Sequence, residues 1–180
     1  MHPRIQEVIA HLDTHRAALH SAVAAAPASS RAQRPGPNRW SVAEILEHLT
    51  LVESRIAKML VTRLIAARAA GIGKETDESP VLPTIDVGRL LDRSTPITAS
   101  EAALPGGEQT ADVSLASLAK QRDALLLTIR EVDGLALSEV TIPHARLGNL
   151  NVYQWLVFLG AHEGRHALQI REASTPVMSR

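Results

Sequence analysis

Three histidines in this 180-residue chain have the type and spacing of a metal site. His162 and His166 are four residues apart, so on a helix their imidazoles lie on one face, one turn apart. Such a pair of neutral imidazoles chelates zinc or nickel, because both ions accept nitrogen ligands. His48 stands between Ile45 and Val52 in a second apolar stripe. Three inward histidines on two helices would hold one divalent metal and leave a position for water or substrate.

The stripe that contains the histidine pair is apolar in its first half. Val152, Trp155 and Leu159 precede the pair at three- and four-residue spacing, and Gln169 follows it. A buried imidazole must be hydrogen-bonded or ligated, because its desolvation otherwise costs free energy. A lone histidine on such a face is more often a hydrogen-bonded core residue, but two at helical spacing plus a third on another helix favour a metal site.

Other histidines offer an alternative. His11 and His15 are also four apart, and they compete as a ligand pair in the first predicted helix. No neighbouring motif supports them, so we expect them on a partly exposed helix face. His144 follows Pro143 in a loop, where it could approach the mouth of the site, and we expect it to be a turn residue.

The segment 162–166 also reads as the H-E-x-x-H string of zinc proteases, in which Glu163 would be the general base. Only fourteen residues follow His166, and they contain no histidine and one acidic residue, Glu172. A downstream third ligand therefore has little room, and the positions of the extended Met-turn motif hold other residues. The sequence argues against a protease.

Four stretches depleted in proline and glycine predict the helices that position these side chains. Residues 4–26, 38–70 and 108–133 contain neither type, and 149–175 contains only Gly160 and Gly164. Good helix formers dominate all four stretches, and their apolar residues recur every three or four positions. Because each amphipathic helix must bury its stripe, we predict an all-α four-helix bundle in one domain, residues 1–180.

About forty residues, 70–111, separate the second and third predicted helices. Connections of this length in a bundle cross over or form a lid, and residues 87–91 are expected to add a helical turn. The third helix should begin near Ser114, and the fourth after Asn149 or Asn151. Residues 140–144 are expected to be briefly extended.

The start of the second helix carries a capping box, in which Ser41 and Glu44 satisfy each other's free backbone N–H groups. Trp40, just before it, is expected to pack on the first turn. Gly160 and Gly164 form, with Ala167, a strip of small residues roughly opposite the histidines. This strip predicts close approach of another helix, within the bundle or across a homodimer, and we expect a homodimer.

Two polar residues are candidates for orienting the histidines. Glu44 lies one turn before His48 and could hold the outer ring N–H of that imidazole. Gln169 lies one turn past His166, where it could orient that ring or contact substrate. The simpler alternatives are that Glu44 serves only the capping box and that Gln169 only covers the end of the bundle.

Composition excludes several classes of function. Nineteen basic residues balance nineteen acidic ones, which argues against a protein that neutralises nucleic-acid phosphates. The most apolar window, residues 155–161, is too short to span a bilayer, and the start has no apolar run of the signal-peptide kind. The chain has no cysteine, so no thiol of its own can act as nucleophile or ligand. We expect a cytoplasmic protein with a small-molecule substrate and neither nucleic acid nor membrane as partner.

Two segments carry a resemblance to a known family. Trp40-Ser41, Glu44-Ile45 and His48-Leu49 form the pattern W-S-x-x-E-I-x-x-H-L, and residues 162–170 form H-x-x-R-H-x-x-Q-I. The chain resembles the DinB-like (YfiT-like) superfamily of bacterial four-helix bundles over nearly its whole length. The resemblance implies a three-histidine site for a divalent metal, zinc or nickel, at His48, His162 and His166.

The resemblance also implies a choice of activities. Characterised relatives include transferases and isomerases that depend on a low-molecular-weight thiol such as bacillithiol or mycothiol, and others are described as metal-dependent hydrolases. We therefore expect a metal-dependent small-molecule enzyme of the thiol-dependent S-transferase or hydrolase type. The alternative is a non-catalytic, metal-binding, stress-associated bundle protein.

Overall fold

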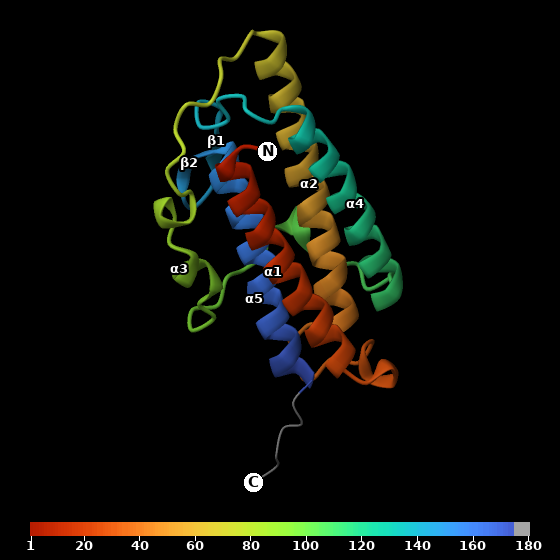
Figure 1. Ribbon diagram of the computed structural model, residues 1–180. Coiled ribbons are helices and arrows are strands. Elements are labelled where there is room, and N and C mark those ends of the chain that lie inside the picture. Colours follow the sequence, from red (N-terminus) through yellow and green to blue (C-terminus); the bar gives the residue numbers. More distant parts are fainter. Residues whose placement is uncertain (175–180) are drawn as a thin grey trace.

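Four long helices run side by side in the structure, a computed structural model that describes residues 1–174 (Figure 1). They are α1 (Pro3–Ala25), α2 (Val42–Ala69), α4 (Ala111–Glu131) and α5 (Val152–Ser174). Helix α1 packs along α5, while α2 contacts both α4 and α5. The predicted all-α bundle is confirmed. None of the helices in residues 1–174 is both long and apolar enough to cross a lipid bilayer.

The direction of the helices explains the long connection. In Figure 1 the chain runs down α1, up α2, up α4 and down α5, so α2 and α4 are parallel neighbours. Helix α2 has 28 residues, and at 1.5 Å per residue the connection must travel about 40 Å back to the level at which α2 began. The forty-residue segment is therefore a crossover, one of the two roles that its length predicted.

The crossover is partly structured and lies against the helices. It contains α3 (Val87–Leu91), where a helical turn was expected, and two single 3₁₀ turns, Leu82–Thr84 and Glu101–Ala103. Helix α3 packs beside α5, and the second 3₁₀ turn contacts α2 (Figure 1). A further 3₁₀ turn, Ala28–Ser30, lies between α1 and α2.

A short hairpin precedes α5. Strand β1 (Thr141–His144) pairs antiparallel with β2 (Gly148–Asn151), with Thr141 opposite Asn151. The sequence predicted the first strand only, because the second has little of the β-branched and aromatic character typical of strands. The hairpin is tied to α5 by the Trp155 indole N–H, which donates to the Ile142 carbonyl at 3.2 Å.

Local capping fixes where the helices begin. The predicted capping box is present, because the Ser41 hydroxyl accepts from Glu44 N–H at 3.2 Å and the Glu44 carboxylate accepts from Ser41 N–H at 2.8 Å. Helix α4 starts at Ala111, three residues before the expected Ser114. Its N-cap is Thr110, whose hydroxyl accepts from the backbone N–H of Val113 at 3.3 Å. The apolar stripe of α4 begins after its first turn, so a prediction from this periodicity alone placed the start of the helix too late.

The strip of small residues on α5 faces α1 inside the bundle. A Cβ atom at Gly160 would lie 2.6 Å from Cδ2 of His11, and one at Gly164 would overlap the His15 imidazole. His11 is buried, and its Nε2–H donates to the Val157 carbonyl at 2.9 Å. The expectation of a partly exposed position is therefore wrong for His11, which is a hydrogen-bonded core residue. Because the two glycines are explained by the packing of α1 against α5, the strip of small residues no longer supports a dimer.

The close approach of α1 and α5 predicts an unusual response to substitution. In an open helix Gly→Ala stabilises by about 1 kcal/mol, but Gly160→Ala should destabilise this protein by about 1–3 kcal/mol, because the new methyl group meets the His11 ring. Urea unfolding of the variant in the native and His11→Ala backgrounds measures this. The loss of unfolding free energy caused by Gly160→Ala should shrink or change sign once the His11 ring is removed. An equal loss in both backgrounds would refute a steric clash between the new methyl group and this ring.

Candidate metal centre

The three histidines singled out by their spacing meet at one point between two helices. His48 lies in the second turn of α2, and His162 and His166 lie in successive turns of α5. One ring nitrogen of each lies within 4.8 Å of the others. Nε2 of His162 and Nε2 of His166 are 3.2 Å apart. The structure thus brings together the residues that the sequence placed far apart.

Two of the imidazoles have their other nitrogen fixed by an acceptor. Nδ1–H of His48 donates to the Ala103 carbonyl at 2.7 Å, and Nδ1–H of His166 donates to Oε1 of Gln169 at 2.7 Å. A proton held on Nδ1 leaves the lone pair on Nε2, which is how metal-binding histidines are usually oriented. Gln169 therefore lies where the sequence expected an orienting group.

One pair of the three nitrogens has the spacing expected around a tetrahedral ion. Two nitrogens bound to zinc at about 2.0–2.1 Å lie about 3.3 Å from each other in tetrahedral geometry, close to the 3.2 Å between His162 and His166. Nδ1 of His162 is buried without a hydrogen-bond partner among residues 1–174. That ring is held instead by stacking on Phe158, with centroids 5.8 Å apart. Nε2 of the same ring faces Nε2 of His166, so His162 turns its inner nitrogen to the site while no residue of 1–174 fixes its outer one.

Burial keeps all three imidazoles neutral. Desolvation, followed by the nearby His48, lowers the pKa of His162 to about 3. Desolvation and the other two histidines place the pKa of His166 well below its usual 6.5, and burial lowers the pKa of His48. At pH 7 each ring therefore offers a lone pair without first losing a proton, as a metal ligand must.

Aromatic side chains surround the histidines. Trp40 packs on the His48 ring with centroids 4.9 Å apart, so it does more than cover the first turn of α2. His144 of β1 contacts both Phe158 and Trp155, at centroid distances of 4.5 and 5.0 Å. It is also a turn residue, because its Nδ1 accepts two backbone N–H groups of the hairpin.

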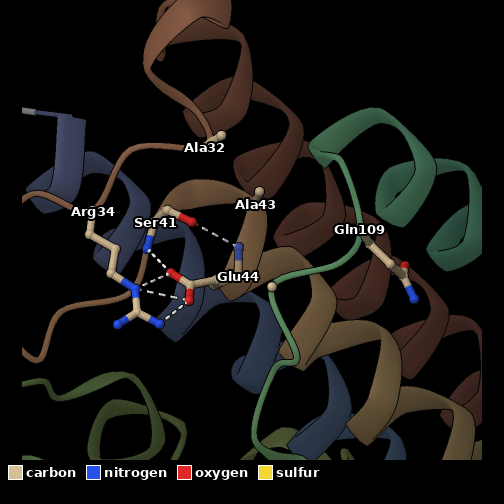
Figure 2. A pocket seen from close by; sticks show the side chains of 7 residues that line it. Ala32, Arg34, Ser41, Ala43, Glu44 and Gln109 are labelled. Carbon is tan, nitrogen blue, oxygen red and sulfur yellow. Dashed lines mark hydrogen bonds and ion pairs between the residues drawn. The ribbon is translucent and has the colours of Figure 1, made fainter.

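The carboxylate of Glu44 is bound by Arg34 and by the cap of α2. Figure 2 shows its carboxylate between Arg34 and the backbone N–H of Ser41, and Nε of Arg34 donates to both oxygens at 3.0 Å. The hydrogen bond from Arg34 lowers the pKa of this carboxyl. The acceptor for the outer N–H of His48 is the Ala103 carbonyl, and Glu44 serves the cap of α2.

Glu163 pairs with arginines rather than with the three histidines. It is fully buried and pairs with Arg16 and with Arg122, whose Nη2 lies 3.2 Å from its Oε1. Glu53 joins this cluster through Arg122 at 3.4 Å, and burial together with Glu163 raises the pKa of Glu53 well above its ordinary value. Glu163 therefore balances buried cations in the core, and the H-E-x-x-H string does not supply a base at the histidines.

Residues 93–103 of the crossover form a strap that runs from α5 to His48. Arg93 at one end pairs with Glu172 of α5 at 2.7 Å, and the Ala103 carbonyl at the other end accepts from His48. Just beyond the strap, the buried carboxylate of Glu47 accepts from the backbone N–H groups of Gly106 and Gly107 at 3.1 and 2.9 Å. Sequence reasoning missed Glu47, although its place beside His48 in the family-like motif was visible.

A helical bundle with a crossover between parallel helices, and with three histidines from two helices facing one another, defines a class of protein. The sequence model of the DinB superfamily matches residues 11–170, so the chain belongs to this superfamily and the resemblance is confirmed. The chain is 27% identical over 140 residues to the uncharacterized protein YuaE of Bacillus subtilis (strain 168), a match that covers 78% of this chain and 80% of that one. No solved structure matches the chain.

The lowered pKa of His162 predicts how the metal-free protein responds to acid. Between pH 6.5 and about 3 the unfolded chain binds a proton on this imidazole and the folded chain does not, so stability falls as the pH falls. Lowering the pH from 7 to 5 should cost about 2 kcal/mol from this group alone. Urea unfolding of metal-free His162→Gln should show a shallower dependence on pH. An unchanged slope would contradict the neutral, buried state of the ring.

Proposed function

We propose that this protein is a divalent-metal-dependent enzyme that acts on a small molecule, of the thiol-dependent S-transferase or hydrolase type. His48, His162 and His166 would hold zinc or nickel. The observation that carries the proposal is the convergence of three neutral imidazoles, two of them with Nδ1–H already donated to an acceptor. When bound, the ion supplies Lewis acidity that lowers the pKa of a water or thiol in its open position.

The residues around the histidines support this role by position. Gln169 and the Ala103 carbonyl orient two of the rings, so the site is arranged before a ligand arrives. Trp40 packs on the His48 ring and Phe158 stacks on the His162 ring, and these contacts would limit the access of bulk water. Because the chain lacks cysteine, a thiol used in the reaction must enter as a cosubstrate, which fits an enzyme of the reducing cytoplasm.

One observation favours the alternative, a non-catalytic metal-binding bundle associated with stress. The acidic residues nearest the ligands in sequence are engaged elsewhere: Glu44 with Arg34, Glu47 with Gly106 and Gly107, and Glu163 with Arg16 and Arg122. None of these three carboxylates is available as a general base beside the histidines. An S-transferase remains the stronger candidate because a thiolate attacks without a protein base.

Metal content tests the proposal directly. Untagged protein should contain about one zinc or nickel ion per chain by elemental analysis, since three histidines with an open position form a single site. His48→Ala, His162→Ala and His166→Ala should each lose the ion, while the exposed His20→Ala control retains it. Metal retained in all three variants would exclude this site. Turnover with a panel of thiols and electrophiles then separates an enzyme from a binding protein.

Gln169 gives a finer test of the oriented site. Gln169→Leu removes the acceptor for Nδ1–H of His166 and should weaken metal binding by about 10–100-fold. Gln169→Glu keeps an acceptor and should bind the metal about as tightly as the native protein. Glu44→Gln is the control, because Glu44 was the other candidate for an orienting residue but binds Arg34 and Ser41 instead, and it should leave metal affinity unchanged. Competition with a chromophoric chelator measures all three, and equal affinities for Leu and Glu at position 169 would refute an orienting role.

The homodimer expected from the sequence stays a prediction. Sedimentation at micromolar concentration should show two chains, and a monomer would refute it. The proposed partner is a small molecule, because the balanced charge of the chain gives no electrostatic basis for binding nucleic acid.

A further inference from the structure

Arg165 is a buried arginine that lacks an ionic partner. In the part of the chain that the structure describes, three arginines are buried, and two of them pair with carboxylates. Arg4 lies 3.1 Å from Asp77 and 3.5 Å from Glu75, and Arg122 lies 3.2 Å from Glu163. Arg165 is only 7% exposed, yet no carboxylate of residues 1–174 lies within ion-pair distance of it. A buried charge without a counter-charge is costly, so this guanidinium requires an explanation.

The hydrogen bonds of Arg165 are incomplete. Its Nη2 donates to the carbonyl of Thr95 in the strap at 3.0 Å, while its Nη1 is buried without a partner. The neighbouring carboxylates are already occupied, because Asp92 accepts from Ser94 and Glu172 accepts from Arg93. The guanidinium therefore has an unfilled donor and only a neutral acceptor for its charge.

The charges around Arg165 balance one another. Arg93 and Arg146 are close enough to act on it electrostatically, and the opposing charges are Asp92 and Glu172. These two cations and two anions cancel, so the charge of Arg165 itself is left uncompensated. Arg146, like Arg165, donates to a strap carbonyl, that of Thr98 at 3.2 Å. The strap is therefore held near its middle by two cationic side chains that bind neutral oxygens.

Arg165 adjoins the candidate metal centre. Arg165 precedes His166 and lies three residues after His162, which on α5 places it one turn from the His162 position. Its charge acts on His162, and the charge of Arg93 acts on His166. The same strap that accepts from Arg165 reaches His48 at its far end through Ala103. A small molecule bound beneath the strap would therefore meet both the histidines and the guanidinium.

We propose that Arg165 binds a carboxylate carried by the small-molecule substrate of the histidine centre. This inference rests on the proposed function for the identity of the ligand. A carboxylate matches the planar fork of a guanidinium, and its charge-assisted hydrogen bonds are stronger than those of a neutral carbonyl. The carboxylate replaces the Thr95 carbonyl as the acceptor for Nη2–H and also accepts a hydrogen bond from Nη1–H. Residues 93–98 must move away from α5 to admit it, so substrate binding and strap opening are coupled.

The first experiment compares charged and neutral thiols on nickel-loaded protein, using the thiolate-to-nickel absorption band as the signal. The probes are mercaptoacetate, 3-mercaptopropionate and 4-mercaptobutyrate, each beside its uncharged amide. At least one acid should bind about tenfold or more tightly than its amide. Arg165→Gln should abolish this preference and keep the nickel. The exposed Arg55→Gln control should keep both the preference and the nickel.

A second experiment separates this inference from the proposed function. In metal-free protein, millimolar succinate should raise the unfolding temperature, and succinamide should not. The rise should be lost in Arg165→Gln, whose own stability should be close to native because it removes an unpaired buried charge. Failure to bind metal would refute the proposed function alone. Equal effects of acids and amides in both experiments, or a preference that survives Arg165→Gln, would overturn the assignment of Arg165.

Discussion

Burial of three neutral imidazoles between α2 and α5 is the constraint on which the rest of the structure depends. Histidine in water titrates near neutral pH, and removing it from water without a partner is unfavourable. Here the Ala103 carbonyl and the Gln169 amide take two of the outer N–H groups, and aromatic rings cover the sides. The inner nitrogens are left facing one another, with Nε2 of His162 and Nε2 of His166 3.2 Å apart, close enough to share a proton or the proposed ion.

Helix α5 can meet this constraint because its other faces carry different partners. The face toward α1 is reduced to Gly160 and Gly164, which lets the imidazoles of α1 approach the backbone. Glu163 lies in the same helical turn as His162, but its carboxylate pairs with Arg16 and Arg122. Adjacent residues of one helix thus contribute to two separate polar sites, and a motif read along the sequence joins groups that the helix keeps apart.

The crossover couples the architecture to the site. Because α2 and α4 are parallel, the chain between them must return along the bundle, and it does so past α5 (Figure 1). The return path supplies the Ala103 carbonyl to His48 and lays the strap across Arg165. The connection is therefore part of the site as well as a link between helices, and its contacts through neutral carbonyl oxygens are weaker than the ionic contacts elsewhere in the core.

The sequence by itself determined the four helices, the capping box of α2, the crossover and the identity of the three histidines. Each of these depends on local spacing, breakers or a family-like motif. Only the tertiary structure decided that His11 is a core residue, that Glu163 pairs with arginines, that Ala103 rather than Glu44 holds His48, and that Arg165 has no carboxylate beside it. These outcomes depend on partners dozens of residues away, and no local pattern records which distant group a side chain will face.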